Sequence, residues 1–482
     1  MKRSLLLFLI VLSSVRAFAE KPNIVLVLVD DLGWADLACQ GSDFYETPHV
    51  DKLAKEGVRF TNGYAASSVC SPSRAAVQTG RYPHRTGITN WIRSRALGAK
   101  APKDGKNPPW KNPKDQWQGK DKLICPPTGR WLESSEVTIA EVLKPQGYVS
   151  CFIGKWHLGT DDWYPTKQGY DYNVGGCDYG EPPSYYDPYS KPKSFHPIAR
   201  EGIPGMPGLE PGAYLTDREA AEAEAFIRKH KDKPFFLMLS HYAVHTPMMP
   251  RADLAAKYRK KKKGDKHANP IYAAMIESVD HAVGVVVNTL EELDLADNTL
   301  IIFTSDNGGV KGLTNNLLRD GKGYPYEGGV RVPFIVKWSG VAKAGTEVSE
   351  PVISMDLLPT IAAAAGAKLP HVELDGKNLK PLLTGSGEFD RETLYWHYPH
   401  YRHERGPYST IRHGNWKLLK WYEGGLSLFN LKDDLQERND LAKSMPEKAK
   451  ELEDMLITHL GSTTHQIPFP NPNYKPEAPN KD

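Results

Sequence analysis

The sequence has few cysteines for its length. Among 482 residues there are only five, and these are scattered. That number is too small for a disulfide-framework protein, and none of the spacings resembles a zinc site. An odd number in an exported protein leaves at least one thiol unpaired or chemically special, and Cys70 is the strongest candidate. The five are Cys39, Cys70, Cys125, Cys151 and Cys177.

The sequence also lacks a surplus of charge of one sign. Residues 1–19 carry three of the 61 basic residues and no acid, so the rest of the chain balances 58 basic against 58 acidic residues. A nucleic-acid-binding domain would show a basic excess, so this class of function is excluded.

Long apolar runs are missing beyond the first residues. Leu5–Leu12 is an apolar run that follows Lys2 and Arg3 and precedes Ala17-Phe18-Ala19, the pattern of a cleavable signal peptide over residues 1–19. The run is shorter than the ~20 residues of a membrane-spanning helix. No later stretch reads as long and apolar enough to span, so we expect a secreted or periplasmic protein without a membrane span.

Buried strands alternate with helices through residues 20–385, which predicts an α/β domain with a large, mostly parallel sheet flanked by helices. Continuous β-branched and leucine runs mark the strands. Between them, Thr216 and Glu219 predict a capping box before a helix over 220–230, and apolar spacing predicts a long helix over 271–293. The expected strands are Asn23–Val29, Tyr148–Ile153, Phe235–Leu239, Thr299–Phe303 and Phe334–Lys337.

Two aromatic- and proline-rich segments, Arg93–Glu133 and Asp178–Gly212, interrupt this alternation and are expected to form ordered rims around a site. After about Gly385 the pattern changes to short strands joined by turns. Residues 386–482 therefore predict a small antiparallel subdomain with one helix and a tail. Its expected elements are strands at Thr393–Trp396, Tyr408–Arg412, Trp416–Trp421 and Ser427–Asn430, and a helix at Pro446–His459.

Oxygen-bearing side chains follow two of the predicted buried strands. Asp30 and Asp31 come after the first, and Asp306 and Asn307 after another. Sites in parallel sheets form at the carboxyl ends of the strands, so these side chains can converge. Oxygen ligands suit Ca²⁺ or Mg²⁺ and not zinc. Each pair taken alone would equally serve as a helix or turn cap.

Cys70 opens the segment Cys70-Ser71-Pro72-Ser73-Arg74, which Gly80-Arg81 closes. Pro72 suits a first helical turn and Gly80 a helix end. Cys70 would then lie at a helix N-terminus, where an anion is favoured, and Arg74 one turn later would hold an oxyanion or an ionised nucleophile.

This segment resembles the signature of the type I, formylglycine-dependent sulfatases of the alkaline-phosphatase-like superfamily. Further segments resemble that family in the right order, from the N-terminal pattern to the last motif. They are Asn23–Gly33, Thr47–Leu53, Gly154–Gly159, His245–Pro247, Ser305–Gly308, and Lys322 followed by Tyr326–Pro333. The resemblance implies a sulfuric ester hydrolase of the arylsulfatase A-like or polysaccharide-sulfatase kind.

The resemblance also implies a mechanism. A separate maturation enzyme would oxidise Cys70 to formylglycine, whose hydrate attacks sulfur and later expels sulfate from an enzyme-bound ester. Asp30, Asp31, Asp306 and Asn307, with the Cys70-derived hydroxyl, would hold Ca²⁺, for which Mg²⁺ is an alternative.

Further residues receive roles through the same resemblance. Arg74 would steady the ionised hydrate, and Lys155 and Lys322 would contact sulfate oxygens. His157 and His245 would move protons. His245 is favoured as the general acid, although the sequence leaves the division between them open. His241 is a candidate for a structural or supporting role.

Some interpretations remain open. Lys257–Lys266 is expected to be a solvated loop, with an acidic-polysaccharide patch as the alternative. Trp396–His403 would contact either a sulfated carbohydrate or the neighbouring domain. Competing functions are a phosphonate or phosphodiester hydrolase of the same superfamily and an inactive glycan-binding relative. The sugar, the sulfate position and the oligomeric state are not determined by the sequence.

Overall fold

The computed structural model describes residues 21–93, 121–193, 197–314, 317–464 and 466–475. Its centre is an eight-stranded sheet of order β10-β2-β9-β8-β1-β7-β5-β6, in which β9 is antiparallel to both neighbours and the other pairs are parallel. The prediction of a mostly parallel sheet is therefore confirmed. The strands are β1 (Asn23–Val29), β2 (Val58–Phe60), β5 (Val149–Gly154), β6 (Tyr172–Val174), β7 (Phe235–Ser240), β8 (Thr299–Ser305), β9 (Phe334–Trp338) and β10 (Thr346–Val348).

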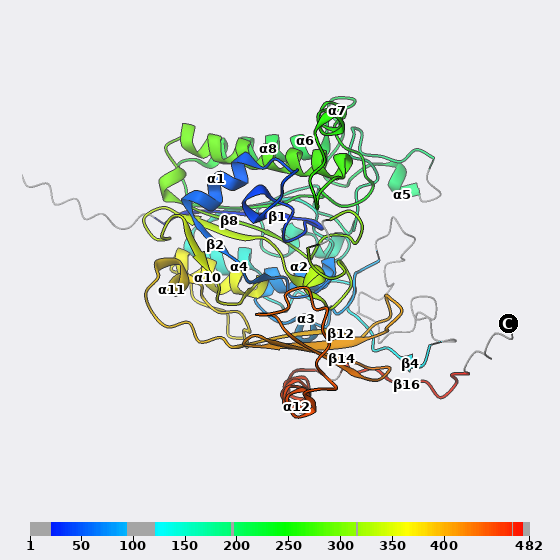
Figure 1. The fold of residues 1–482 in the computed structure, drawn as a ribbon. Coiled ribbons are helices and arrows are strands. Elements are labelled where there is room, and N and C mark those ends of the chain that lie inside the picture. The colour runs from blue at the N-terminus through cyan, green and yellow to red at the C-terminus, as the bar shows by residue number, and fades with distance from the viewer. Residues whose placement is uncertain (1–20, 94–120, 194–196, 315–316, 465, 476–482) are drawn as a thin grey trace, which may run out of the picture.

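Helices cover both faces of the sheet (Figure 1). Every residue of β1 is buried, because alternate side chains enter two different cores. Val25, Val27 and Val29 pack with one layer of helices, whereas Ile24, Leu26 and Leu28 pack with the other. The first layer holds α1 (Pro48–Glu56), α6 (Leu215–His230), α7 (Ala252–Lys260) and α8 (Pro270–Glu292), and the second α2 (Cys70–Thr79), α4 (Ile139–Leu143) and α10 (Leu357–Ala365).

Short elements complete this part of the chain. The two-residue strands β3 and β11 pair in parallel with each other, and β4 pairs with β16 near the end of the described chain. Their bounds are β3 (Gly63–Tyr64), β4 (Leu123–Ile124), β11 (Val352–Ile353) and β16 (Phe469–Pro470), with short helices α3 (Pro83–Thr86), α5 (Pro197–Arg200), α9 (Glu327–Val330) and α11 (Lys380–Thr384).

The predicted capping box of Thr216 and Glu219 is wrong. Helix α6 begins at Leu215, its N-cap residue is Tyr214, and no side chain caps it. Glu219 is fully buried and instead binds His241, with Oε2 2.6 Å from Nδ1. The buried carboxylate is satisfied by His241 and not by the backbone N–H group that the local pattern indicated.

Helix α8 corrects the expectation that no later stretch is long and apolar enough to span a membrane. Among the helices in the described residues, α8 alone is long and apolar enough to span a membrane, by length and composition. Within the structure, 78% of its apolar window is buried, against the sheet and α6. The five cysteines are all free thiols. The N-terminal segment expected to be a signal peptide lies outside the described residues.

The C-terminal residues form a four-stranded antiparallel sheet with one helix, as expected. The strands lie in the order β12-β13-β14-β15, and α12 packs on one face through Leu452, Leu456 and Leu460. The elements are β12 (Thr393–Tyr398), β13 (Tyr408–His413), β14 (Trp416–Trp421), β15 (Leu426–Asn430) and α12 (Pro446–Thr463).

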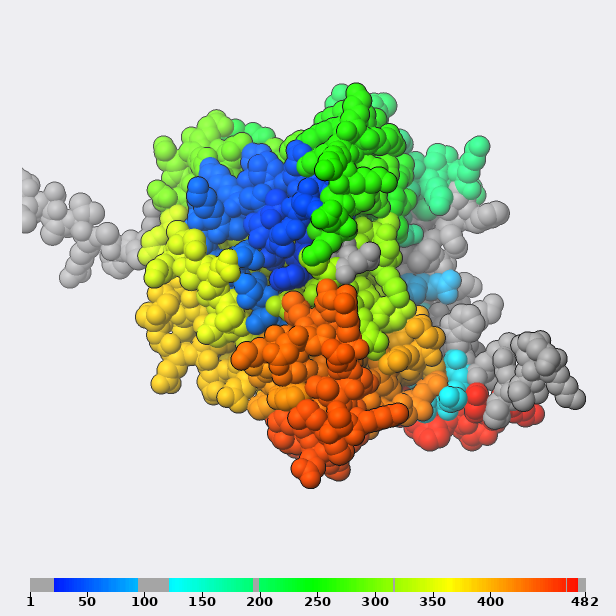
Figure 2. Space-filling model, viewed as in Figure 1, coloured from blue at the N-terminus to red at the C-terminus, as the bar shows by residue number. Residues whose placement is uncertain are grey.

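This subdomain packs closely against the large domain (Figures 1 and 2). The Trp396 indole donates to the carbonyl of Ala65 at 2.8 Å. Lys417 is fully buried between Glu327, at 2.8 Å, and Glu437, at 2.9 Å. Trp396 and Lys417 therefore fix the subdomain to the strands and loops that carry the candidate site.

The basic run Lys257–Lys266 differs from the solvated loop that was expected. Its first residues form the end of α7. Lys257 binds Glu46 and Glu277, and Lys261 also binds Glu46. Local ion pairs thus compensate part of the run, while residues such as Lys262 remain exposed.

Candidate active site

Four neighbouring parallel strands, β8, β1, β7 and β5, carry the site at their carboxyl ends. Asp306 follows β8, Asp30 follows β1, Lys155 follows β5, and His245 lies in the loop after β7. Backbone hydrogen bonds continue between these loops, from Asp30 N to the Ala243 carbonyl at 2.9 Å and from Lys155 N to the Ser240 carbonyl at 2.7 Å. The predicted convergence of residues far apart in sequence is confirmed.

Cys70 is the first residue of α2, as the proline and glycine spacing predicts. Gly80 ends the helix with φ 68°, a conformation that suits glycine. The two serines of the motif hold this end of the helix. Ser71 Oγ donates to the His157 carbonyl and accepts from Ile92 N, each at 3.0 Å. Ser73 Oγ donates to the Ser67 carbonyl at 3.0 Å.

Arg74 lies beneath Cys70 with 2% of its side chain exposed. Its Nε and Nη2 are each 2.8 Å from Asp306 Oδ2, and its Nη1 donates to Ser240 Oγ at 2.7 Å. Because a guanidinium presents donors in a fixed fork, Arg74 ties the end of β7 to the loop after β8.

Two lysines face the paired carboxylates. Lys155 Nζ is 2.6 Å from Asp30 Oδ2, with both side chains fully buried, and Lys322 Nζ is 2.7 Å from Asp31 Oδ1. Asn307 Nδ2 also donates to Asp31 Oδ1 at 2.7 Å. Burial raises the pKa of Asp30 well above its usual value despite Lys155. Burial also opposes ionisation of Asp31, but Lys322 and His245 lower its pKa.

The donor set fits a hard cation. Asp30 Oδ1 and Asn307 Oδ1 are buried and accept no hydrogen bond, although buried acceptors are normally satisfied. Ligand atoms of Asp30, Asp31, Cys70 and His245 lie within 4.8 Å of one another. Carboxylate and amide oxygens that lack donors suit Ca²⁺ or Mg²⁺.

The two histidines flank Cys70, and each uses a different ring nitrogen for a hydrogen bond to a backbone carbonyl. His157 Nε2 is 2.7 Å from the Ile92 carbonyl, whereas His245 Nδ1 is 2.8 Å from the carbonyl of Thr246. A carbonyl only accepts, so each of these nitrogens carries a proton. The free positions are therefore Nδ1 of His157, which is buried without a partner, and Nε2 of His245, which lies 3.5 Å from Asp31.

Charge around Cys70 favours an anion at this position. Burial alone would raise the pKa of its thiol, but the positive charges of Lys155 and Lys322 hold the pKa well below the ordinary value. The anion-binding position predicted from the helix start is thus reinforced by these two lysines.

The backbone around the site is constrained. Asp31 has φ 63° and His157 φ 60°, in a left-handed region that costs a residue with a side chain about 1 kcal/mol or more. Gly180 lies against the His157 ring, and a β-carbon there would be 2.8 Å from Cε1. The absence of a side chain at Gly180 therefore leaves the ring room for this position.

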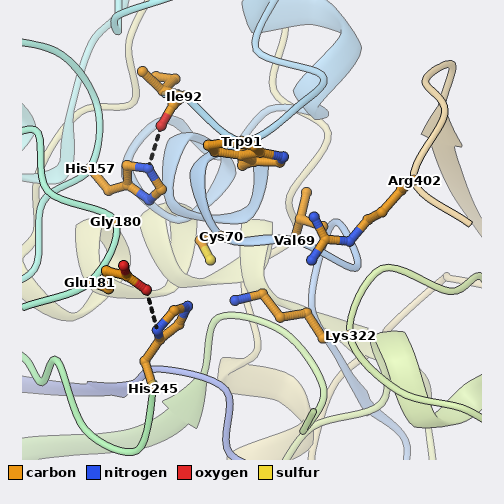
Figure 3. Close-up of a pocket in the computed structure, with 10 residues that line it drawn as sticks. All are labelled: Val69, Cys70, Trp91, Ile92, His157, Gly180, Glu181, His245, Lys322 and Arg402. Atoms are coloured by element: carbon orange, nitrogen blue, oxygen red, sulfur yellow. Dashed lines mark hydrogen bonds and ion pairs between the residues drawn. The ribbon is translucent and has the colours of Figure 1, made fainter. Parts of the chain in front are cut away.

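Cys70 lies at the bottom of a cavity of about 230 Å³ (Figure 3). The sequence patterns placed Gly180, Glu181 and Arg402 within segments expected near a site but did not single them out, and they missed Val69, Trp91 and Ile92. Gly180 and Glu181 lie within the predicted rim segment Asp178–Gly212. Ile92 directly precedes the other segment, of which residues 94–120 lie outside the described residues. The mouth residues are Val69, Trp91, Ile92, Gly180, Glu181 and Arg402.

The structure shows the contacts of two groups whose roles the sequence left open. His241 is buried and binds Glu219, away from the lining of the cavity. In the segment Trp396–His403, His397 and His400 are buried while Arg402 lines the cavity. This segment therefore serves interdomain packing and also reaches the site.

Comparison with known proteins shows which protein family has this sequence. The Sulfatase family model matches residues 22–367, and the N-sulphoglucosamine sulphohydrolase C-terminal model matches residues 320–466. Human arylsulfatase A is 34% identical over 454 residues, covering 88% of this chain and 78% of the relative.

Solved structures agree in fold. Ps i-CgsB, in complex with k-i-k-neocarrahexaose, has a TM-score of 0.75 at 33% identity and covers 94% of this chain and 95% of its own. The phosphonate monoester hydrolase of Agrobacterium radiobacter, with a TM-score of 0.65 at 19% identity, covers 94% of this chain and 100% of its own. This second likeness shows the shared fold alone.

The sheet, its helices and the site at its strand ends define a hydrolase of the alkaline-phosphatase-like fold. Within that class, the chain belongs to the sulfatase family and is a sulfuric ester hydrolase.

Proposed function

We propose that this enzyme releases inorganic sulfate from a sulfated carbohydrate, using a formylglycine made from Cys70 by a maturation enzyme, with Ca²⁺ bound beside it. The observation that carries the proposal is the position of Cys70. It begins a buried helix and faces two lysines, two histidines and a group of buried oxygens.

Asp30, Asp31, Asp306 and Asn307 are the proposed calcium ligands, together with the oxygen that replaces the Cys70 sulfur. The unsatisfied oxygens of Asp30 and Asn307 support this assignment. When bound, calcium would offset negative charge on the nucleophile and on sulfate oxygens. Mg²⁺ would fit the same oxygen ligands and is distinguished from Ca²⁺ by metal analysis.

The hydrate of formylglycine would supply a hydroxyl as the nucleophile. Lys155 and Lys322 lie close enough to Cys70 for their charges to act on it. Their ammonium groups would bind the sulfate oxygens as point charges. Arg74, held by Asp306, keeps a permanent positive charge beneath the nucleophile.

The ring hydrogen bonds support a division of labour between the histidines. His157 donates through Nε2, so its Nδ1 is the free acceptor and would take a proton from the hydrate. His245 donates through Nδ1. Against burial and Lys322, Asp31 and Asp30 raise the pKa of its ring, so Nε2, 3.5 Å from Asp31, would also carry a proton and deliver it to the leaving oxygen. This assignment agrees with the role of general acid that the sequence favours for His245.

Two observations support the proposal that the substrate is a carbohydrate: an aromatic residue at the mouth of the cavity and the ligand of one similar structure. Trp91 lines the cavity and offers an aromatic face on which a sugar ring can pack. Ps i-CgsB, 33% identical to this chain, was solved with an oligosaccharide bound. Export through an N-terminal signal peptide is part of the proposal and is tested by the mass of the mature N-terminus.

The test is sulfate release from sulfated mono- and oligosaccharides, an aryl sulfate and an aryl phosphonate, after co-expression with a maturation enzyme. We expect release from at least one sulfated sugar, and none from the Cys70→Ala variant. Mass spectrometry reports formylglycine at position 70, and metal analysis reports calcium. Turnover of the phosphonate without release from any sulfate would overturn the proposal.

A further inference from the structure

The mouth of the cavity carries two charges that the proposed chemistry does not use. Figure 3 shows Glu181 and Arg402 on opposite sides of Cys70, with the Arg402 guanidinium directed into the cavity. Glu181 comes from the loop after β6, and Arg402 from the connection between β12 and β13. The two walls therefore differ in charge.

Arg402 differs from the cations around Cys70 in lacking a carboxylate partner among the described residues. Arg74, Lys155 and Lys322 each bind an aspartate at 2.8 Å or less. No carboxylate of the described residues lies within 4.0 Å of the Arg402 guanidinium. Its neighbour Tyr398 has a pKa that burial raises to about 12, so this phenol is neutral and leaves the charge uncompensated.

The Arg402 side chain packs on the backbone of the large domain. Its side chain crosses Gly323, where φ is +90° and a β-carbon would be 2.2 Å from Nε. Gly323 immediately follows Lys322, which lines the same cavity. A glycine here thus lets the arginine lie beside the lysine that is proposed to bind the scissile sulfate.

Glu181 makes the opposite wall unfavourable for an anion. Its Oε2 is 3.9 Å from His245 Nδ1 and 3.4 Å from Thr246 Oγ1, and 47% of its side chain is exposed. A carboxylate repels anions and accepts hydrogen bonds from hydroxyl groups. A sugar with its sulfate at Cys70 would thus place neutral hydroxyls at Glu181.

We propose that Arg402 forms a second anion subsite, so that the preferred substrate is a sulfated sugar with another anionic group on the same or the adjoining ring. This inference rests on the proposed function and names its substrate class. A second sulfate and a uronic carboxylate share the required chemistry, because a guanidinium binds either through paired oxygens.

The test compares a hexose monosulfate, the corresponding disulfate and a monosulfated hexuronic acid. Arg402→Met keeps much of the side-chain length and removes the charge. We expect it to lower kcat/KM for the disulfate or the uronic acid at least tenfold, and for the monosulfate less than threefold. The substrate with the larger loss identifies the second group as sulfate or carboxylate.

Arg405→Met is the matched control, because Arg405 follows in the same loop and binds the Tyr326 hydroxyl but does not line the cavity. It should leave all three rates within twofold of wild type. Raised salt should reduce the wild-type preference, since exposed charge pairs are screened.

The outcomes separate this inference from the proposed function. If the wild-type enzyme releases sulfate and Arg402→Met lowers kcat/KM equally for all three substrates, the second subsite is overturned and the proposed function is not. Absence of sulfate release with phosphonate turnover would overturn the proposed function. Calorimetric binding to the Cys70→Ala protein needs no turnover, and an unchanged disulfate affinity after Arg402→Met would also overturn the second subsite.

Discussion

The floor and the mouth of the cavity are built differently. The charged groups that support the floor, Asp30, Lys155 and Arg74, do not line the cavity and are at most 2% exposed. Each charge there has a partner on another strand end. At the mouth, Glu181 is 47% exposed and Arg402 lacks a carboxylate partner among the described residues. A floor fixed by the sheet can hold one chemistry, whereas loops at the mouth can vary and select the substrate.

The largest expected effect comes from breaking the floor at its nucleophile. Cys70→Ala removes the only group proposed to attack sulfur, so sulfate release should fall by at least about a thousandfold. The measurement is sulfate released per hour by ion chromatography. Cys39→Ala, a thiol that does not line the cavity, is the control, and comparable losses in both variants would contradict a special role for Cys70.

The attachment of the mouth-bearing subdomain is the next target. Lys417→Met leaves Glu327 and Glu437 buried without their shared cation, and we expect about 3–5 kcal/mol of destabilisation in urea unfolding. Burial raises the pKa of Glu437 to about 7. Burial would also raise the pKa of Glu327, but Lys417 helps to hold it at about 2.

Lys420→Met on the same strand is the control for this change. Its partner Glu453 and Lys420 itself are partly exposed, so the loss should stay below about 1 kcal/mol. Equal destabilisation by the two variants would show that the buried cluster does not fix the subdomain.

A smaller effect is expected where the mouth loop touches the floor. Gly180→Ala places a methyl group 2.8 Å from His157 Cε1 and should shift the ring that is proposed to accept a proton. We expect kcat to fall about tenfold, which corresponds to about 1.4 kcal/mol. Gly461→Ala in α12, where a β-carbon meets no atom within 4 Å, should keep the wild-type rate. A wild-type kcat in Gly180→Ala would remove the positioning role of this glycine.

The smallest effect concerns acid sensitivity of the subdomain. Burial lowers the pKa of His397 and His459 to about 4 from an ordinary value of 6.5. Between these values only the unfolded chain binds the protons, so the stability they contribute is present above pH 6.5 and is lost as the pH falls towards 4. The melting temperature should therefore decrease over this range.

His459→Phe isolates one of these groups. The His459 ring stacks on Tyr395 at 3.7 Å, and phenylalanine keeps a flat ring but cannot be protonated. The decrease in melting temperature between pH 6.5 and pH 4 should become smaller by a few degrees. A decrease identical to that of wild type would exclude His459 as a source of the acid sensitivity.

The floor could be predicted residue by residue from the sequence. For the mouth only segments could be predicted: Glu181 lies in the expected rim Asp178–Gly212 and Arg402 in Trp396–His403. Asp30, Asp306 and Lys155 follow buried strands, and the parallel sheet fixes where such residues meet. Trp91, Glu181 and Arg402 come from irregular segments whose paths depend on tertiary contacts, such as Arg402 over Gly323. A local pattern carries no record of those contacts.

Two corrections have the same origin. Thr216 and Glu219 match a capping box in spacing, yet His241, distant in sequence, binds the glutamate. Lys257 and Lys261 read as a solvated run, yet Glu46 from another segment binds both. In each case a partner far along the chain decides the conformation that local spacing leaves open.

The most direct test of the difference between floor and mouth uses two variants and two substrates. His245→Gln alters the floor and Arg402→Met the mouth, and kcat/KM is measured for a hexose monosulfate and its disulfate. We predict that His245→Gln lowers both values by the same factor, because the leaving oxygen needs a proton in either case. Arg402→Met should lower mainly the value for the disulfate. Selective loss in His245→Gln, or equal loss in Arg402→Met, would contradict the account.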